Sequence, residues 1–150
     1  MGADHMKNQK DYSVGEFILR ENDVADCAYV IMSGEVGIYK NGLKGKIIPL
    51  AVLKAGEYLG ELGVVTGQTR TAEAIALTPV SVVRITKGIL EDELSKAPAW
   101  VAALLLGLIE RLVRADELLR KHQTSDEILL QKIEPVVKNT LLVSKKKAAG

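Results

Sequence analysis

Short apolar segments separated by glycine-containing turns fill the first half of the chain. Ala28 to Met32 is strongly apolar, and a Ser-Gly-Glu turn leads from it into Val36 to Tyr39. An Asn-Gly pair, which is typical of hairpins, then precedes the apolar segment Ile47 to Leu53. Pro49 in this segment indicates an edge strand or a bulge, because proline cannot donate to a sheet ladder. Many short strands with regular turns predict a sandwich or barrel over residues 12–85.

The hydrophobic period changes after these strands, and helices are predicted from there on. Thr86 is a suitable N-cap for a short helix over Lys87 to Lys96. Pro98 lies where proline is tolerated, near the start of a longer helix from Ala99 to about His122. The chain is therefore predicted to be mainly β with C-terminal helices, which is an α+β fold.

The longer helix carries apolar residues at spacings of 4, 3, 4, 3 and 4, which form a heptad seam. The seam consists of Val101, Leu105, Leu108, Leu112, Ala115 and Leu119. More apolar residues widen this surface beyond what one β domain would cover, namely Leu104, Leu106, Ile109 and Val113. We therefore expect a homodimer through the 99–122 helix. The alternative is a helix that lies on its own β domain without a partner.

A last helix is predicted after a polar segment. Thr124 to Glu127 has the T-S-D-E pattern of a capping box. We expect a helix from Ile128 to about Glu134, which Pro135 would interrupt or bend. Residues 135–143 are apolar enough to dock, and Lys145 to Gly150 is expected to be a frayed tail.

The length of 150 residues fits one domain with a hydrophobic core. We expect a leader over residues 1–11, in which His5-Met6 resembles a cloning-site remnant. The domain would cover residues 12–122, with its β part ending at residue 85 and its helices following over residues 86–122. Residues 123–150 would form a C-terminal helix and tail, or a linker to an output domain absent from this chain.

The net charge and the cysteine content indicate which partners the chain can attract and in which compartment it lies. The 20 basic and 19 acidic residues nearly balance, so no overall field would attract nucleic acid. The single cysteine, Cys27, cannot form an internal disulfide and is expected to be a small core residue in a reducing compartment. The apolar run from Ala97 to Ile109 is too short for a membrane span, and no secretory signal is visible. The sequence therefore predicts a cytoplasmic protein that binds neither nucleic acid nor membrane.

The candidate ligand-binding residues lie between Ala55 and Ala76, where Glu61 precedes Arg70 by nine residues in an apolar stretch. Charges in such a stretch need partners, either each other or a ligand. The arginine fork suits phosphate oxygens, the glutamate can accept from a sugar hydroxyl, and Gly60 and Gly63 would let the backbone approach an anion. A 3′,5′-cyclic nucleotide combines these groups. The alternative is a turn with a surface ion pair.

The whole pattern, G-E-L followed by a short loop and R-T-A, resembles the phosphate-binding cassette of the cyclic nucleotide-binding domain family. The resemblance covers roughly residues 12–122 and implies a β-roll, or double-stranded jelly roll, followed by a long dimerisation-type helix. It implies that Glu61 holds the ribose 2′-hydroxyl and Arg70 the cyclic phosphate. The implied ligand-binding set is Leu59, Gly60, Glu61, Leu62, Arg70, Thr71 and Ala72. Leu59 and Thr69 depart from the family, which often has phenylalanine and proline at these positions.

The resemblance also implies roles for the long helix. In bacterial cAMP receptor proteins this helix forms the dimer and closes over the base, and the base contacts would fall at Arg111, Ala115 and Asp116. Ala115 lacks the hydroxyl found there in those receptors. Solvated charges on the helix face are the alternative for the other two residues. The implied ligand is cAMP, with cGMP possible because a threonine at position 71 is found with either nucleotide.

We therefore expect a cyclic nucleotide sensor and not an enzyme. Occupancy would be transmitted by a population shift through the 99–122 helix to a partner or an output domain. One alternative is a structural homodimerisation module with a vestigial pocket. Another is a metal enzyme of the cupin type, but such sites need clustered histidines and the chain has only His5 and His122.

Overall fold

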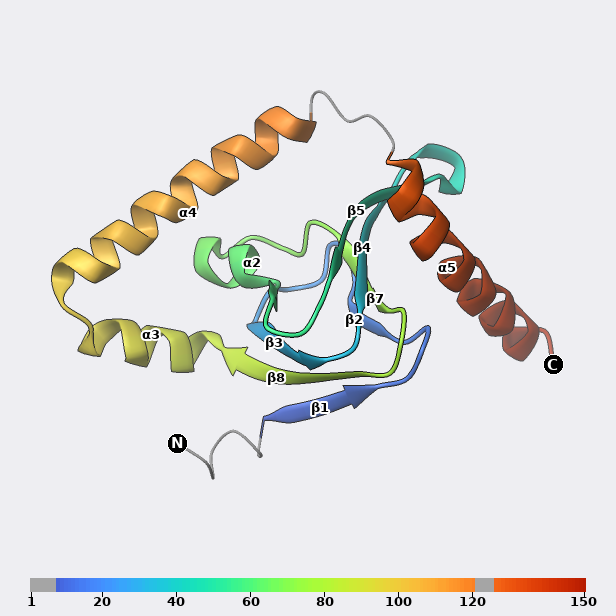
Figure 1. The fold of residues 1–150 in the computed structure, drawn as a ribbon, viewed down its shortest axis with the longest axis horizontal. Coiled ribbons are helices and arrows are strands. Elements are labelled where there is room, and N and C mark those ends of the chain that lie inside the picture. The colour runs from blue at the N-terminus through green and yellow to red at the C-terminus, as the bar shows by residue number, and fades with distance from the viewer. Residues whose placement is uncertain (1–7, 121–125) are drawn as a thin grey trace.

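The computed structural model describes residues 8–120 and 126–150, apart from the side chains of residues 116, 117, 119 and 120. Two four-stranded antiparallel sheets form a β-roll, with helices after it (Figure 1). Sheet A has the order β1 (Gln9–Tyr12), β8 (Val80–Thr86), β3 (Cys27–Ser33) and β6 (Tyr58–Leu59). Sheet B has the order β2 (Phe17–Leu19), β7 (Glu73–Ala76), β4 (Val36–Asn41) and β5 (Ile47–Leu53). The predicted fold class is confirmed.

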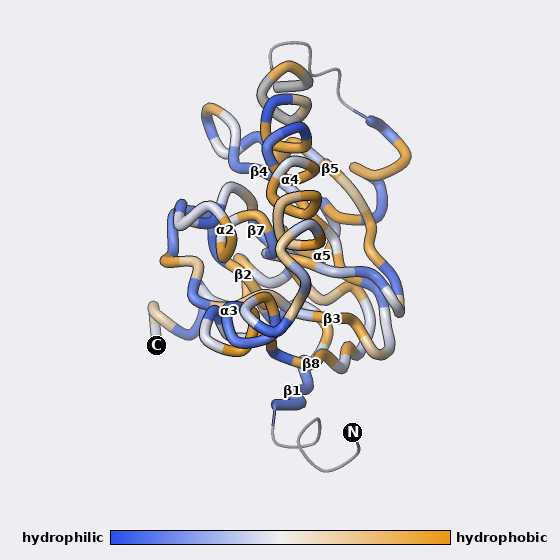
Figure 2. The backbone as a smooth tube through the Cα atoms, turned by 90° about the vertical axis from the view of Figure 1, so that its left-hand side faces the viewer, coloured by the Kyte–Doolittle hydropathy of each residue, from blue (hydrophilic) through white to orange (hydrophobic). Residues whose placement is uncertain are grey.

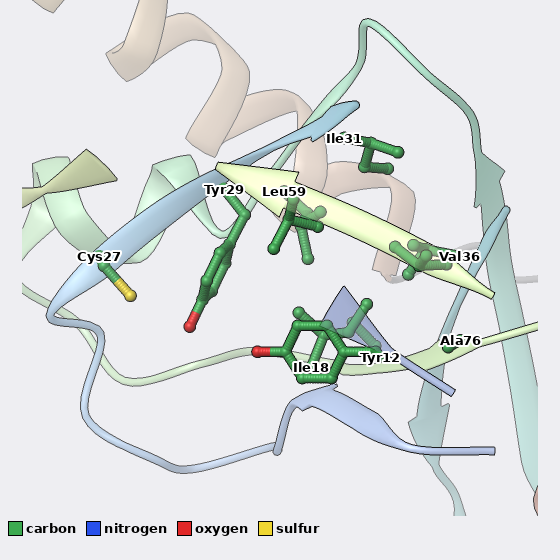
Figure 3. Packing of buried hydrophobic residues seen from close by; sticks show 11 residues of the cluster. Tyr12, Ile18, Cys27, Tyr29, Ile31, Val36, Leu59 and Ala76 are labelled. Carbon is green, nitrogen blue, oxygen red and sulfur yellow. The ribbon is translucent and has the colours of Figure 1, made fainter. Parts of the chain in front are cut away.

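The interior of the roll is a cluster of side chains from both sheets, which Figure 3 shows from close by. It includes Tyr12, Ile18, Cys27, Tyr29, Ile31, Val36, Leu59 and Ala76. Cys27 is buried there, as expected of a small core residue. The strand β1 was not predicted, because only Tyr12 of its four residues is buried and Gln9, Lys10 and Asp11 carry no apolar signal. It pairs with β8, so the β region begins at Gln9 rather than at residue 12.

Pro49 lies in β5, which is an edge strand of sheet B. The register between β4 and β5 also shifts where Tyr39 pairs with Pro49. Both readings of this proline, an edge strand and a bulge, are therefore confirmed, since neither arrangement requires an N–H from the proline. The Asn41-Gly42 pair begins the predicted hairpin turn, which continues through the short 3₁₀ helix η1 (Leu43–Gly45).

Three helices follow β8 among the described residues. The first is α3 (Lys87–Lys96), and the Thr86 hydroxyl accepts from the Ile89 amide as the predicted N-cap. The second is α4 (Ala99–Arg120), which is drawn away from the roll in Figure 1. Hydrophobic positions recur along α4 (Figure 2), and many of its large apolar side chains are exposed, namely Trp100, Leu104, Leu106, Leu108, Leu112 and Leu118. The predicted end at His122 lies outside the described residues.

The last helix, α5 (Glu127–Ala148), is longer than predicted. Its N-cap is Asp126, whose carboxylate accepts from the Ile128 and Leu129 amides, while Thr124 and Ser125 lie outside the described residues. The expected end of this helix at about Glu134 is wrong, because the helix continues through Pro135. The proline is exposed, whereas Ile133 and Val137 on either side of it are buried, so tertiary packing outweighs the missing hydrogen bond. The expected frayed tail is helical through Ala148.

The docking surface for α5 is the outer face of sheet B, where Ile133 and Val137 pack with Tyr39, Ile47 and Ile75 (Figure 1). A glycine makes this approach possible, because a Cβ at Gly37 would come within 2.9 Å of the Ile133 side chain. The Thr140 hydroxyl also donates to the Gly15 carbonyl at 3.2 Å. Part of the apolar segment 135–143 therefore docks, through Val137 and Thr140, whereas Leu141, Leu142 and Val143 are exposed. Among the described helices, none is long and apolar enough to cross a membrane.

Candidate ligand-binding site

A hollow of about 270 Å³ opens between the inner face of sheet B, β6 and the helix α2 (Glu61–Thr66). This volume is close to the lower end of the range for small-molecule sites, about 300–1,000 Å³. The structure brings the whole predicted ligand-binding set to its wall, namely Leu59, Gly60, Glu61, Leu62, Arg70, Thr71 and Ala72. The rest of the wall is mainly apolar, so a ligand would be partly desolvated there.

The helix α2 replaces the turn and loop that were expected between the two halves of the cassette. Sequence reasoning missed it because a glycine, two valines and a threonine among its six residues follow no helical pattern. Gly60 caps its start with φ of 77° and Gly67 its end with φ of 71°, which is the left-handed region that favours glycine. Glu61 is therefore the first residue of the helix, and its exposed side chain lies at the hollow.

The Arg70 side chain is 5% exposed and is held by groups of the protein wall. Its Nη1 donates to the Gly60 carbonyl at 2.9 Å, and its Nη2 donates to the Cys27 carbonyl. The Cys27 sulfur lies 3.6 Å from the same nitrogen. The charge thus has backbone partners, and neither of these bonds involves Glu61. The sequence alternatives for Arg70, pairing with Glu61 or with a ligand, did not include this arrangement.

Asp26 is a functional candidate that the sequence analysis missed. Its carboxylate lies 3.9 Å from Arg70 Nη2 and 2.7 Å from Arg84 Nη2, so two arginines share it. Hydrogen bonding from the Cys27 side chain, together with the Arg84 charge, holds the pKa of Asp26 below its usual value. Lys87 is the first residue of α3, and its backbone amide donates to the Asp26 carbonyl at 3.1 Å. Asp26 therefore connects the cassette arginine to the start of the helices.

The backbone around Arg70 is fixed by the turn before β3. The Arg70 amide donates to the Asp23 carbonyl at 2.8 Å, and the Asn22 amide donates to the Arg70 carbonyl at 2.9 Å. Asn22 itself has a positive φ of 71°, which asparagine tolerates better than most residues. The turn over residues 21–23 thus holds the start of the second half of the cassette, at Arg70, in place.

Glu73 is a second buried charge that the sequence analysis did not single out, and it is 5% exposed. Its Oε1 accepts from the side-chain nitrogen Nδ2 of Asn41 at 3.0 Å, and its Oε2 lies 3.3 Å from Arg20 Nε. Burial, and then the charge of Glu73, raise the pKa of Tyr39 to about 12. The Arg20 side chain that pairs with Glu73 is half exposed, so this ion pair joins a buried carboxylate to a group at the surface.

Two of the three predicted base contacts are not brought to the cassette. Arg111 and Ala115 are exposed on α4 and are not among the residues that line the hollow, and the side chain of Asp116 lies outside the described residues. Their role as base contacts stays a prediction. Among the described residues, no group of three His, Cys, Asp or Glu side chains could hold a metal ion, while His5 and His122 lie outside them.

The two glycines that flank α2 offer a matched test of the Arg70 contact. Both have positive φ, but a Cβ at Gly60 would lie 2.5 Å from Arg70 Nη1, whereas a Cβ at Gly67 would meet nothing within 4 Å. We expect Gly67→Ala to lower the free energy of unfolding by about 1–2 kcal/mol through backbone strain alone. Gly60→Ala should cost about 1–3 kcal/mol more, because Arg70 must move. Urea unfolding of both variants measures the difference, and equal losses would contradict the packing of Arg70 against Gly60.

Comparison with known proteins identifies similar chains. The family profile described as cyclic nucleotide-binding domain matches residues 9–97. The cAMP-dependent protein kinase regulatory subunit of Aspergillus niger is 36% identical over 74 residues, which cover 49% of this chain and 17% of that protein. The CRP-like cAMP-activated global transcriptional regulator of Mycobacterium tuberculosis is 28% identical over 106 residues, 71% of this chain and 47% of that protein. The chain thus spans less than half the length of these curated relatives.

A solved structure is also similar to this chain in fold and sequence. The EAL enzyme Bd1971 in its cAMP-bound form superposes with a TM-score of 0.64 and 34% identity, over 72% of this chain and 29% of that one. The superposed region is a minor part of the enzyme chain, so the likeness concerns one region of that protein.

Proposed function

The chain belongs to the cyclic nucleotide-binding domain family, and from that premise we propose that it is a sensor that binds cAMP in the hollow beside α2. The observation that carries this proposal is the position of Arg70, a buried arginine in the wall of the hollow that contains the predicted cassette. The alternative is a structural module with a vestigial pocket, in which Arg70 would only hold the Gly60 and Cys27 carbonyls.

The assignments within the site follow from the donors and acceptors present. A guanidinium has more N–H groups than the two that Gly60 and Cys27 engage, so Arg70 can bind a phosphate oxygen without leaving the wall. Backbone amides of Gly60, Leu62, Thr71 and Ala72 would supply the remaining donors. Glu61 accepts from the ribose 2′-hydroxyl. Relatives named for cAMP support cAMP as the ligand, and the structure of Bd1971 with cGMP supports cGMP as a second one.

Transmission of occupancy would begin at Asp26. A phosphate at Arg70 competes with the Asp26 carboxylate 3.9 Å away and so redistributes Asp26 toward Arg84. Because the Asp26 carbonyl holds the first amide of α3, this change reaches α3 and then α4. A ligand shifts such an equilibrium only by its different affinity for the two states. The output then depends on a partner or another domain, as expected of a regulatory chain rather than an enzyme.

The role of Glu61 can be tested by removing the contact from either side. We expect Glu61→Ala to weaken cAMP binding by about tenfold, and 2′-deoxy-cAMP to bind the unaltered protein more weakly by a similar factor. If both changes remove the same hydrogen bond, the variant should bind cAMP and 2′-deoxy-cAMP with nearly equal affinity. Titration calorimetry of the four combinations measures this coupling. Independent, multiplying losses would show that Glu61 does not hold the 2′-hydroxyl.

The helix α4 is the proposed dimer contact. Three members of the predicted seam, Leu108, Leu112 and Ala115, are exposed in the single chain, while Val101 and Leu105 are half-buried. Exposed leucines at heptad spacing are what a second copy would cover. The side chain of the last member, Leu119, lies outside the described residues.

Charge placed on this seam should separate the copies. We expect Leu108→Glu combined with Leu112→Glu to yield monomers at concentrations where the unaltered chain is a dimer, with little loss of monomer stability because both side chains are exposed. Leu106→Glu is the control, since it is equally exposed but lies on another side of the helix. Sedimentation equilibrium measures the masses. A monomeric unaltered chain, or dimers in the double variant, would contradict the seam.

A further inference from the structure

The two faces of sheet B serve different parts of the molecule. Its inner face forms a wall of the hollow, and its outer face holds α5, which lies beyond the residues that the family profile matches (Figure 1). One row of paired residues across β7, β4 and β5 lines the hollow, namely Ala74, Ile38 and Ala51. The adjacent row lies beneath α5, namely Ile75, Gly37 and Val52. One peptide bond along each strand therefore separates the wall of the hollow from the docking surface of α5.

The strand β5 connects the two surfaces most closely. It is an edge strand that pairs with β4, and its register shifts at Pro49. The helix α5 packs on β5 and β4, where it covers Ile47 and Val52. Without α5 these two apolar side chains would be exposed to water, and less would hold the edge strand in place against β4. The same strand forms part of the wall of the hollow through Leu50, Ala51 and Leu53.

The contact that holds α5 on the sheet is small. Ile133 and Val137 are its two buried side chains, and the Thr140 hydroxyl adds a hydrogen bond to the Gly15 carbonyl. Beyond Thr140 every residue of the helix is exposed. Pro135 removes a hydrogen bond within the helix, so α5 depends on packing rather than on helix propensity. Elements with few buried contacts open at a lower free energy than the whole domain, so α5 can undock while the roll stays folded.

We propose that α5 sets the ligand affinity of the hollow from the opposite face of sheet B, with Ile133 and Val137 as positioning residues. Docked α5 holds β5 against β4, so the wall is ordered before the ligand binds. When α5 is undocked, the ligand must order this wall itself, which raises its Kd. By reciprocity, the ligand favours docked α5 by the same factor. The inference rests on the proposed function, because it requires a ligand in the hollow, and it adds a route through sheet B that does not involve Asp26.

Titration calorimetry of the full chain with cAMP tests the role of α5, at a temperature where circular dichroism shows each variant to be folded. We expect Ile133→Ala to raise the Kd about five- to tenfold, which is within the range typical of coupling between two sites. Ile133→Val should restore most of the affinity, because it keeps most of the packed side chain. Val80→Ala is the control for stability, since Val80 is buried in sheet A and does not line the hollow. It should leave the Kd within about twofold of that of the unaltered chain.

Hydrogen exchange tests the coupling in the reverse direction. Saturating cAMP should slow the exchange of the backbone amides of residues 132–140 in the unaltered chain, by a factor close to the rise in Kd that Ile133→Ala causes. A milder variant keeps the test decisive if Ile133→Ala does not fold. Thr140→Val removes the hydrogen bond to Gly15 but leaves the apolar contact in place, so it should raise the Kd about two- to threefold.

The outcomes separate this inference from the proposed function. A rise in Kd in the α5 variants but not in Val80→Ala, together with slower exchange in α5 when cAMP is bound, would confirm the inference. An unchanged Kd in the α5 variants, an equal rise in Val80→Ala, or exchange in α5 that cAMP does not slow would overturn the role of α5 while cyclic nucleotide binding stands. Failure of the unaltered chain to bind cAMP would overturn the proposed function, and this inference with it.

Discussion

Replacing Arg70 with alanine should lower the affinity for cAMP by a factor of ten to a hundred or more. Charge-assisted hydrogen bonds contribute about 1.5–3 kcal/mol each, which is the free energy that corresponds to about this loss. Arg70→Lys should recover little of it, because an ammonium cannot reproduce the fork that reaches a phosphate and two carbonyl groups together. Titration calorimetry of the folded variants measures the affinity.

Arg70 also supports the fold, so the same substitution should reduce stability. It leaves the Gly60 and Cys27 carbonyls without this donor, which costs about 1–3 kcal/mol. Arg20→Ala is the matched control, since Arg20 also pairs with a carboxylate, that of Glu73, but does not line the hollow. It should leave cAMP affinity within about threefold. Equal affinity of the unaltered chain and Arg70→Ala would refute Arg70 as the phosphate partner.

Replacing Ile133 with alanine should have the largest effect on stability outside the binding site. Ile133 is 0% exposed between α5 and sheet B, where it contacts the surface opened by Gly37. Truncating a buried isoleucine to alanine costs about 2–5 kcal/mol. For a chain of this length the loss would lower the melting temperature by roughly 5–15 °C. Thermal unfolding followed by circular dichroism measures it.

The control for Ile133 lies in the same helix. Ile128 is 73% exposed, so Ile128→Ala makes the same chemical change without removing a packed side chain. It should shift the free energy of unfolding by no more than about 0.5 kcal/mol. Similar small effects of both substitutions would mean that α5 does not depend on its contact with sheet B.

Much of the fold could be predicted because its signals are local. The short apolar segments, the Asn41-Gly42 turn and the Thr86 cap each have a sequence pattern that matches their structure. The end of the α5 helix could not be predicted from local signals. Its passage through Pro135 depends on Ile133 and Val137 packing against strands distant in the chain, and helix propensity contains no information about that surface. The polar strand β1 was missed for the same reason, since its pairing with β8 defines it.

The residues of the candidate site were likewise predicted where their signal is local in sequence and missed where it is not. The positions of Glu61 and Arg70 in one hollow follow from a contiguous pattern, and the structure brings both to it. Asp26 and Glu73 were missed because each is defined by partners that are remote in sequence, Arg84 for the first and Asn41 for the second. No spacing rule connects such pairs.

The central claim is that the hollow binds a cyclic nucleotide, and thermal unfolding with ligands tests it most directly. The chain would first be unfolded, separated from any bound small molecule and refolded. Cyclic AMP, cGMP and 5′-AMP would then be added separately at about 100 times a plausible Kd, an excess that stabilises a binding protein by about 2.7 kcal/mol. We expect cAMP to raise the melting temperature by roughly 5–10 °C, cGMP to raise it as well, and 5′-AMP to leave it unchanged. No shift with either cyclic nucleotide, or an equal shift with 5′-AMP, would contradict the claim.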